Sequence, residues 1–363
     1  MIKDRVQKEK ALRYILSKDW FPQLELEVFS HRSTAKKAYS ITDIDVLASI
    51  PDEFSGYRTL IFDCKTGERI SPVSRALWQK GLMSRMRADR GICIVGRENI
   101  EADHRYTGAE LGINILSDTE FDKFIECTSP RHTTTLGSLA NIDAWDKYFS
   151  IPAQYKELTP AVLFSKSRYW LAESESEACR KTVGVLMQVR PELDPKKVEH
   201  LAIAGDICSL FMHSLSTMVS KIFSHYLLPD NRDELSSALL FLLYGGRDSY
   251  QIRNRIREMV IAKSEEKPSF LSLPDWDKFI QLSRQTLDSP VEVNKSALII
   301  REIAWAIMVS NTNRDYVTGL CTKYPQGARF AIQGIDYLFD AVKMPPEFKE
   351  IYVKELMGVQ KPK

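Results

Sequence analysis

The spacing of apolar residues changes near residue 135, and this change limits the possible folds more than any other feature of the chain. Before that point, short apolar runs predict β-strands between helices. In QLELEVFS, Leu24, Leu26 and Val28 alternate with polar residues, as in a half-buried strand. From Pro160 onward almost every apolar pattern has a helical period. The sequence therefore predicts an α/β region followed by an all-α region.

The first region is predicted to contain a helix, three strands, a helix, two more strands and a closing helix. The runs ITDIDVLAS and YRTLIFDCK are the second and third strands, and turn residues between Pro51 and Gly56 separate them. A helix from about Val73 to Asp89 precedes the strands GICIVG and GINIL. Ser117 and Glu120 have the spacing of a capping box for the last helix. A mixed central sheet flanked by helices satisfies this order.

Three segments follow from these patterns. Residues 1–130 form the predicted α/β domain, and the Ser/Thr-rich stretch SPRHTTTLGS marks a linker region over 131–160. Residues 161–363 form the predicted all-helical domain. Its clearest helical stretches run near 170–189, 195–227, 231–245, 248–263, 275–286, 291–310 and 326–342.

Composition narrows the location and the partners. Lys and Arg number 50 against 48 acidic residues, so nucleic-acid contact needs a local basic patch. The six cysteines form no C-x-x-C pair, which indicates a reducing compartment. The charged start MIKDRVQKEKALRYIL is not a signal peptide, and the longest apolar run, Ala238 to Tyr244, is too short to span a bilayer. We expect a soluble cytoplasmic protein without membrane contact.

The hairpin over residues 41–65 carries the strongest chemical signal. Side chains alternate across a strand, so Asp63 and Lys65 share a face, and antiparallel pairing about a turn near Phe54-Ser55 brings Asp45 beside them. Two close carboxylates repel each other unless a cation lies between them. Mg²⁺ prefers such oxygen ligands, and an ammonium group nearby can stabilise developing negative charge.

The spacing Asp45-x17-Asp63-Cys64-Lys65 on two strands resembles the catalytic hairpin of the PD-(D/E)xK, or restriction-endonuclease-like, nuclease superfamily. Glu9 lies on the first predicted helix, where many such families have an acidic residue. The stretch after Lys65, with loop, helix and buried strand, is similar to that of Mrr-type and RecB-type nucleases. The resemblance covers about residues 1 to 127 and implies a restriction-endonuclease-like α/β core.

The resemblance also implies roles for these residues. Asp45, Asp63 and the carbonyl of Cys64 would bind Mg²⁺, for which Mn²⁺ would substitute, and Glu9 would complete the site. Lys65 would orient or activate the attacking water. The chemistry implied is phosphodiester hydrolysis, most naturally of DNA, as in restriction or anti-phage defence.

Nucleic-acid contacts are expected from two basic segments. One is the loop before the second strand, with Lys36 and Lys37, and the other is the helix carrying Arg75, Gln79 and Lys80. Gln79 is also the candidate for a glutamine that is frequent in the superfamily. These charges can equally form a solvated surface.

Ordinary structural roles compete with the metal-site interpretation. The carboxylates and Lys65 can form an exposed ion-pair ladder, and Glu9 can be an exposed helix partner of Arg13. The dipeptide Pro51-Asp52 lies in the turn, too far along the ladder from Asp63 to share its site.

Two further functions compete with a DNA-cleaving enzyme. One is an inactive nuclease-like protein that binds nucleic acid or acts as a scaffold, and the other is an RNA-directed nuclease with the same site. In each case the helical region would bind the target, a protein partner or a second copy of the chain.

Overall fold

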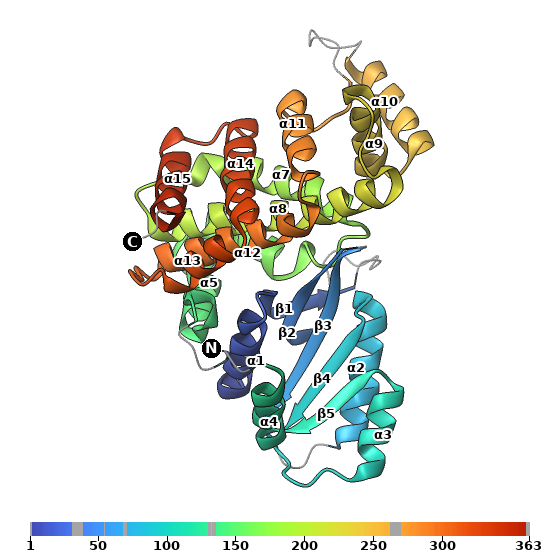
Figure 1. Cartoon of the computed structure of the whole chain (residues 1–363), viewed down its shortest axis with the longest axis vertical. Coiled ribbons are helices and arrows are strands. Elements are labelled where there is room, and N and C mark those ends of the chain that lie inside the picture. The colour runs from blue at the N-terminus through green and yellow to red at the C-terminus, as the bar shows by residue number, and fades with distance from the viewer. Residues whose placement is uncertain are drawn as a thin grey trace.

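A computed structural model describes residues 2–30, 39–53, 55–67, 71–129, 132, 136–261 and 270–360 of the chain. The sheet and its helices form one end of the molecule, and a helical part forms the other (Figure 1). This arrangement confirms a mixed sheet flanked by helices and followed by a helical part.

The sheet contains five strands in sequence order: β1 (Phe21–Phe29), β2 (Ser40–Asp52), β3 (Gly56–Lys65), β4 (Arg90–Val95) and β5 (Ile113–Ser117). The first three are antiparallel, while β3, β4 and β5 run parallel. The antiparallel strands have short connections, and the parallel ones need crossovers, which helices provide. The sheet is therefore mixed, as the order of elements predicts.

Two layers of helices cover the sheet. On one face lie α1 (Arg5–Ser17) and α4 (Asp118–Thr128), and on the other lie α2 (Pro72–Met86) and α3 (Ala102–Glu110) (Figure 1). The capping box predicted for α4 is present, because the Ser117 side chain accepts from the Glu120 N–H and Glu120 accepts from the Ser117 N–H. The sequence pattern does not predict α3, because this helix has only one buried residue and its apolar period is weak.

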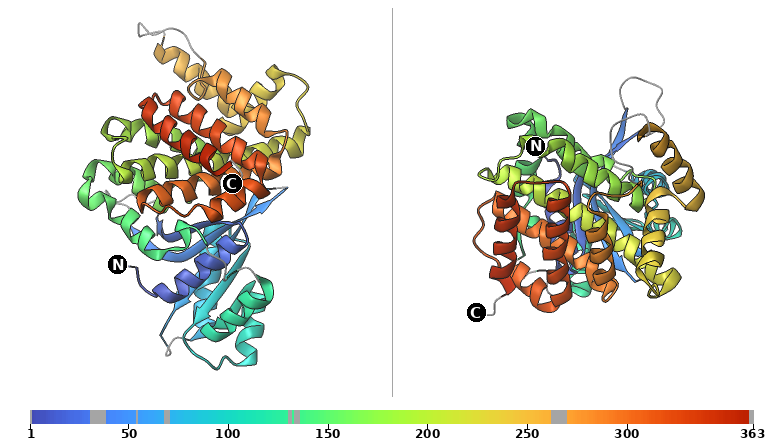
Figure 2. Two further views of the ribbon diagram at one scale, coloured as in Figure 1. Left: turned by 60° about the vertical axis from the view of Figure 1, so that its left-hand side comes forward. Right: turned by 90° about the horizontal axis from the view of Figure 1, so that it is seen from above.

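The remainder of the described chain is helical (Figures 1 and 2). Its elements are η1 (Ser138–Ala140), α5 (Ile142–Gln154), η2 (Lys156–Leu158), α6 (Thr159–Leu163), the π-helix η3 (Phe164–Arg168), α7 (Glu175–Val189), η4 (Arg190–Glu192), α8 (Val198–Tyr226), α9 (Arg232–Tyr244), α10 (Arg247–Ile261), α11 (Trp276–Thr286), α12 (Pro290–Met308), α13 (Asp315–Lys323), α14 (Pro325–Ala341) and α15 (Pro346–Gln360).

The described residues between 136 and 160 do not form the linker that the Ser/Thr-rich stretch suggests. They contain η1, α5 and η2, and Trp145 and Tyr148 of α5 are completely buried. Ile142, Trp145, Tyr148 and Ile151 follow one another at helical spacing on the buried face of α5. The segment is thus part of the core, because its apolar spacing outweighs the polar residues before it.

Helix α8 lies at the centre of the helical part. By length and by its mean hydropathy of 1.3 it could cross a membrane, but the whole apolar window is buried inside the fold. Serines, histidines and one aspartate interrupt its apolar residues, so it does not contain the longest continuous apolar run of the sequence. Its position is that of a core helix.

The two parts share one continuous core. The same cluster of buried apolar side chains includes Phe62 of β3, Phe121 of α4 and Phe211 of α8. At the tip of the β2–β3 hairpin, the Tyr57 ring stacks on the His213 ring of α8 at a centroid distance of 3.9 Å. The hairpin therefore joins the sheet to the helical part as well as carrying the candidate site.

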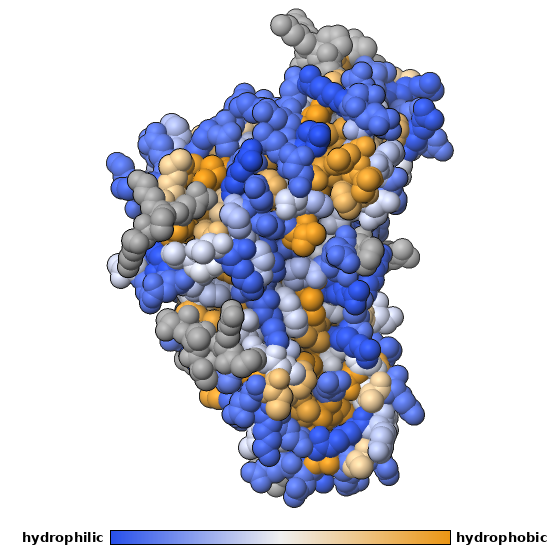
Figure 3. All heavy atoms as spheres, viewed as in Figure 1, coloured by the Kyte–Doolittle hydropathy of each residue, from blue (hydrophilic) through white to orange (hydrophobic). Residues whose placement is uncertain are grey.

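The surface is mainly polar on the face shown in Figure 3, where hydrophobic residues gather over the region of β4 and β5 and between α9 and α11. Helix α10 also exposes apolar side chains, with Ile252, Ile256 and Met259 each more than half exposed.

Candidate metal centre

The site lies where the sheet divides. Strand β2 pairs with β3 only as far as Val46, which faces Phe62, and its preceding residues pair with β1 alone. Beyond Phe62, β3 continues beside β4 alone. Asp45 and Asp63 are the first residues past this division, so their carboxylates face a gap between strands. The Cys64 N–H there donates to Asp45 Oδ2 at 2.7 Å, so the carboxylate replaces a missing ladder acceptor.

Asp45 lies between two ammonium groups although it is only 3% exposed. Its Oδ1 is 2.9 Å from Lys8 Nζ, and its Oδ2 is 3.0 Å from Lys65 Nζ. Burial by itself would raise the Asp45 pKa, but the charges of Lys8 and Lys65 and the bond from the Cys64 N–H outweigh it and lower the pKa below its usual value. Asp45 is therefore a buried carboxylate that stays ionised.

Asp63 has a different set of partners. Arg75 Nε donates to its Oδ2 at 2.7 Å, and Lys65 Nζ lies 3.5 Å from its Oδ1. The Arg75 guanidinium also lies over the Trp78 ring, 3.9 Å from the centroid. Partial burial would lower the pKa of Arg75, but the hydrogen bond and charge of Asp63 raise it. Lys65 is therefore the one cation of the described chain that contacts both aspartates, while Arg75 holds Asp63 against α2.

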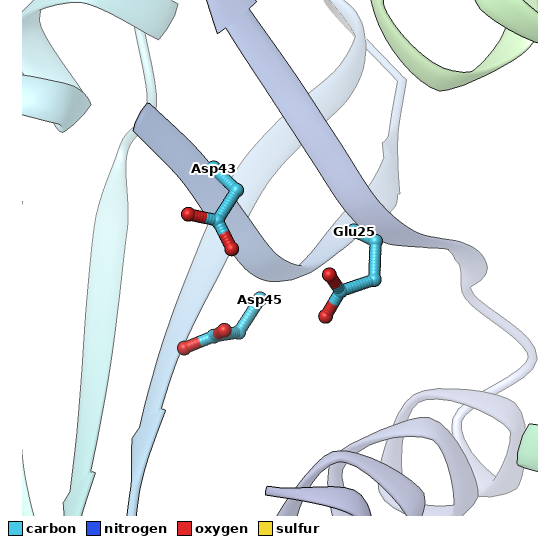
Figure 4. A group of neighbouring side chains, drawn as sticks. All are labelled: Glu25, Asp43 and Asp45. Atoms are coloured by element: carbon cyan, nitrogen blue, oxygen red, sulfur yellow. The ribbon is translucent and has the colours of Figure 1, made fainter. Parts of the chain in front are cut away.

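A second group of carboxylates adjoins Asp45. Glu25 of β1 and Asp43 and Asp45 of β2 each offer an oxygen, and these oxygens lie within 4.8 Å of one another (Figure 4). Glu25 also accepts a hydrogen bond from Lys8 Nζ. Burial raises the Glu25 pKa despite its bond to Lys8. Among the described residues, this group has the spacing expected around a bound cation.

Glu25 is held in an unusual backbone conformation. Its φ is 51°, in the left-handed region, although it lies within strand β1. The neighbouring pairs Leu24–Val46 and Leu26–Ile44 keep the same register, so Glu25 lies opposite Asp45 between them. A non-glycine residue in this region costs on the order of 1–3 kcal/mol and occurs preferentially at functional sites.

Helix α1 is positioned against the end of β3 by its first turn. The Asp4 carboxylate accepts from the Thr66 N–H at 3.2 Å, and Gln7 Nε2 donates to the Lys65 carbonyl at 3.5 Å. The buried side chains of Ala11 and Ile15 fix the rotation of the helix on the sheet. This rotation directs Lys8 into the site.

The structure thus brings together four of the residues expected from the sequence: Asp45, Asp63, Cys64 and Lys65. Cys64 meets Asp45 through its backbone N–H, and its thiol is buried in the core. An exposed ion-pair ladder does not describe the two aspartates, because each is 3% exposed.

Glu9 is not placed with them. Its Oε1 is 2.9 Å from Arg13 Nη2 one turn along α1, and both side chains are at least one-third exposed. Successive residues on a helix point about 100° apart, so the rotation that turns Lys8 inward turns Glu9 outward. The acidic partner of Asp45 is Glu25 rather than a residue of the first helix.

The expected nucleic-acid contacts also need correction. Arg75 is engaged by Asp63, and Gln79 is 1% exposed. The Gln79 amide donates to the carbonyls of Ile61 at 3.0 Å and Ile92 at 3.2 Å, so it ties β3 to β4 from beneath and does not face solvent. Lys80 is exposed, as expected. Lys36 and Lys37 lie outside the described residues.

Asp52 has the turn role that the sequence predicts. Its carboxylate accepts from the Ser55 N–H at 2.9 Å and pairs with Arg58, also at 2.9 Å. The hydrogen bonds from Ser55 and the nearby charge of Arg58 lower the Asp52 pKa. Asp52 therefore belongs to the turn, whereas Asp45 is the aspartate that contacts Lys65.

The sequence patterns do not identify Lys8, Glu25 or Asp43 as members of the site. A partial signal exists for Glu25, which sits at the centre of the alternating strand QLELEVFS. No local signal distinguishes Lys8 from Lys10 on the same helix. Only the packing of α1 on the sheet makes that choice.

The donor set fits a hard divalent cation. All three nearest ligands are carboxylate oxygens, which Mg²⁺, Mn²⁺ and Ca²⁺ prefer over nitrogen and sulfur. Their oxygens lie within 4.8 Å of one another, which is close enough to share one ion, since opposite oxygens around such ions are roughly 4–5 Å apart. Comparison of the chain with protein-family models, curated proteins and solved structures gives no match.

Proposed function

We propose that the chain is a metal-dependent nuclease with a PD-(D/E)xK-type catalytic hairpin. The observation that carries this proposal is the position of Lys65 Nζ, 3.0 Å from Asp45 and 3.5 Å from Asp63, where β2 and β3 separate. Carboxylates on two neighbouring strands and a lysine two residues beyond the second are the arrangement that the resemblance implies.

The topology supports the same proposal. A helix, an antiparallel three-stranded unit, a second helix and a parallel fourth strand follow one another in the order expected of a restriction-endonuclease-like core. Fold alone does not identify an activity, so the proposal depends on the site.

The side chains divide the work as follows. Glu25, Asp43 and Asp45 would hold a divalent ion, which lowers the pKa of bound water and neutralises phosphate charge when present. Lys65 places a positive charge beside the reacting phosphate and stabilises negative charge as it develops. Arg75 holds Asp63 in place through its guanidinium, and Gln79 holds β3 against β4 so that the hairpin stays rigid.

Lys8 would regulate access to the carboxylates. Its ammonium bridges Glu25 and Asp45, so it neutralises the same oxygens that a cation would use. A divalent ion therefore competes with Lys8 or displaces it toward one of its two partners. This competition predicts weaker metal binding than three carboxylates alone would give.

We further propose DNA as the substrate, a cytoplasmic location and a role in restriction or anti-phage defence. RNA is the alternative substrate with the same site. The helical part would contribute target binding, a protein partner or a contact between two copies of the chain.

Two measurements on one set of proteins test the proposal. Thermal unfolding is followed with EDTA and with increasing Mg²⁺ or Mn²⁺, because an ion that binds only the folded state raises its stability. Cleavage of plasmid, single-stranded and duplex DNA and of RNA is measured under the same conditions. Asp45→Asn and Lys65→Met are the test variants, and Glu9→Gln and Asp52→Asn are the matched acidic controls.

We expect metal-dependent cleavage in the wild type and both controls, a loss of at least about 100-fold in both test variants, and loss of metal stabilisation in Asp45→Asn. Cleavage that persists undiminished in Asp45→Asn and Lys65→Met would remove the catalytic assignment.

A nuclease-like scaffold without activity is the second candidate, and one observation favours it. Lys8, Lys65 and Arg75 already neutralise Asp45 and Asp63 through ion pairs within the protein. If Mg²⁺ and Mn²⁺ leave the thermal transition unchanged and no nucleic acid is cleaved, the scaffold is the better description.

A further inference from the structure

A cavity of about 680 Å³ lies where the end of β1 meets the helical part. Its apolar lining includes Phe29 of β1, Leu163, Leu171 and Val185. The volume falls within the roughly 300–1,000 Å³ of pockets that hold small molecules. This cavity is separate from the carboxylates of the candidate metal centre.

The cavity is nevertheless tied closely to that centre. The π-helix η3 forms part of its lining, and Ser167 Oγ of η3 donates to the Glu27 carbonyl at 2.6 Å. Lys166 Nζ pairs with the Glu27 carboxylate at 2.6 Å. Glu27 is paired with Asp43 in the sheet and is two residues from Glu25. π-helices are rare and occur frequently at functional sites.

The wall of the cavity contains a glycine with no packing explanation. Gly184 lies within α7, where glycine is less favourable than alanine, and no atom of the described residues lies within 4 Å of the Cβ it lacks. By contrast, a Cβ on Gly205 would clash with Tyr352 Oη, so packing requires that glycine. Open space beside a helical glycine also occurs at Gly81, so open space alone does not indicate a ligand. Gly184 differs because it lines the cavity.

The charged residues at the cavity are positive. Arg168 and Lys181 line it, and both are exposed. Lys181 pairs with Glu177 one turn away at 2.9 Å, a surface pair of the kind that another anion can replace easily. The lining therefore offers apolar walls, two aromatic side chains, Phe29 and Phe164, and two cations.

We propose that this cavity binds a nucleotide, with the base against the apolar wall at Phe29 and Gly184 and the phosphate near Arg168 and Lys181. Aromatic stacking accepts any base, and guanidinium and ammonium groups bind phosphate by charge. A free nucleotide and an unstacked nucleotide within a strand share this chemistry. The inference goes beyond the proposed cleavage reaction and does not require the metal centre.

The test measures binding to the full-length protein in EDTA, so that cleavage and metal binding play no part. Nucleoside monophosphates are titrated by calorimetry, and single-stranded DNA and RNA oligonucleotides by fluorescence anisotropy. Inorganic phosphate is the control for charge alone. Gly184→Phe fills the cavity, and Gly184→Ala is its matched control because a single methyl group meets no neighbour.

We expect saturable binding by the wild type and by Gly184→Ala, and at least a tenfold weaker affinity for Gly184→Phe. A second variant, Arg168→Gln with Lys181→Gln, should weaken binding and reduce the dependence of affinity on salt. This double variant tests the proposal if Gly184→Phe does not fold. Glu9→Gln, a surface change outside both sites, should bind as the wild type does. Because EDTA removes divalent ions, failure of this proposal is distinct from failure of the nuclease proposal.

Tighter binding of mononucleotides identifies a free nucleotide as the ligand, and tighter binding of oligonucleotides identifies a strand. The proposal is overturned if neither binds, if inorganic phosphate binds as tightly as the nucleotides, or if the cavity-filling and double variants both bind as the wild type does.

Discussion

Two clusters of buried charged residues differ in whether every charged group has partners within the protein. We call the first the closed cluster and the second the open cluster. In the helical part, Arg301 of α12 and Asp206 of α8 are both fully buried and 2.7 Å apart. Arg301 also donates to the Pro22 carbonyl and to Gln23 Oε1, and Tyr148 donates to the second Asp206 oxygen. Every charge in this cluster has protein partners, and aromatic rings enclose the guanidinium.

The cluster at the division of the sheet remains open. Asp45 and Asp63 are buried, but Lys65 is 26% exposed, Glu25 is half-buried and Asp43 is exposed. Four carboxylates from β1, β2 and β3 converge there, against the three cations Lys8, Lys65 and Arg75. Burial alone therefore does not mark a functional site, because the closed cluster is buried more deeply than the open one. The difference is that the open cluster reaches the surface at Asp43 and Lys65, where we propose that a metal ion binds.

The two clusters are also physically connected. Arg301 binds β1 at Pro22 and Gln23, two residues before Glu25, whose left-handed backbone turns toward Asp45. The closed cluster thereby anchors β1, the strand that carries Glu25 of the open one. We expect changes in the closed cluster to act on stability and changes in the open cluster to act on ligand binding.

The largest effect is expected from Arg301→Met. Removing the guanidinium leaves the Asp206 charge buried without a cation, which typically costs about 3–5 kcal/mol of unfolding free energy. Urea denaturation measures this loss. The double variant Arg301→Met with Asp206→Leu should recover part of it, because no lone charge remains. A loss below about 1 kcal/mol in Arg301→Met would mean that the closed cluster does not anchor the fold.

The next effect concerns pH and Glu302, a buried carboxylate that accepts hydrogen bonds from the Ser138 and Leu139 N–H groups. Burial raises the Glu302 pKa to about 7, despite those bonds. The folded state therefore keeps a proton that the unfolded state loses near pH 4.5, and the contribution of Glu302 is lost as pH rises toward 7. The unfolding free energy should fall by about 3 kcal/mol as Glu302 loses this contribution.

Comparing the pH dependence of unfolding in the wild type and in Glu302→Gln isolates this contribution from that of other carboxylates. The wild type should lose stability relative to the variant between about pH 4.5 and 7. Asp45 behaves in the opposite sense, because its lowered pKa makes its contribution present above the unfolded pKa and lost at lower pH. Parallel pH profiles for wild type and Glu302→Gln would contradict the shift at Glu302.

A smaller effect is expected from Lys8→Met, which opens the metal centre further. Without divalent ions, Glu25 and Asp45 lose a shared partner, so we expect a loss of about 2 kcal/mol in unfolding free energy. With Mg²⁺ or Mn²⁺ the rise in melting temperature should be larger than in the wild type, because the competing ammonium is gone. An equal or smaller rise would show that Lys8 does not compete with the ion.

The smallest effect is expected from Glu9→Gln. This variant distinguishes the surface position of Glu9 in the structure from the metal-binding role expected from the sequence. Glu9 forms a surface ion pair, so its loss should change stability by less than about 0.5 kcal/mol. The metal-induced rise in melting temperature should equal that of the wild type. If Glu9→Gln abolishes that rise, Glu9 binds the ion after all and the position of α1 must change on binding.

Much of the site could be predicted because its geometry is local. Asp63 and Lys65 share a face through the alternation of one strand, and the turn between Asp52 and Gly56 brings Asp45 beside them. The strands, the capping box of α4 and the long helices of the second part also follow from short-range apolar patterns and capping chemistry.

What could not be predicted depends on contacts between distant segments. Lys8 and Glu9 are adjacent, and only the packing of α1 on the sheet decides which one faces Asp45. Gln79 looks like a surface residue of a basic helix until β3 and β4 are placed beneath it. Helix α5 also depends on distant contacts. The polar residues before it suggest a linker, and only its packing shows that it belongs to the core.

The sequence by itself therefore determined the hairpin of Asp45, Asp63 and Lys65, because a period of two and a short turn specify it locally. The tertiary structure decided which cations and carboxylates surround that hairpin, where β1 bends at Glu25 and how the helical part anchors it. Those features depend on the rotation and register of elements far apart in the chain, which are set by packing of the shared core.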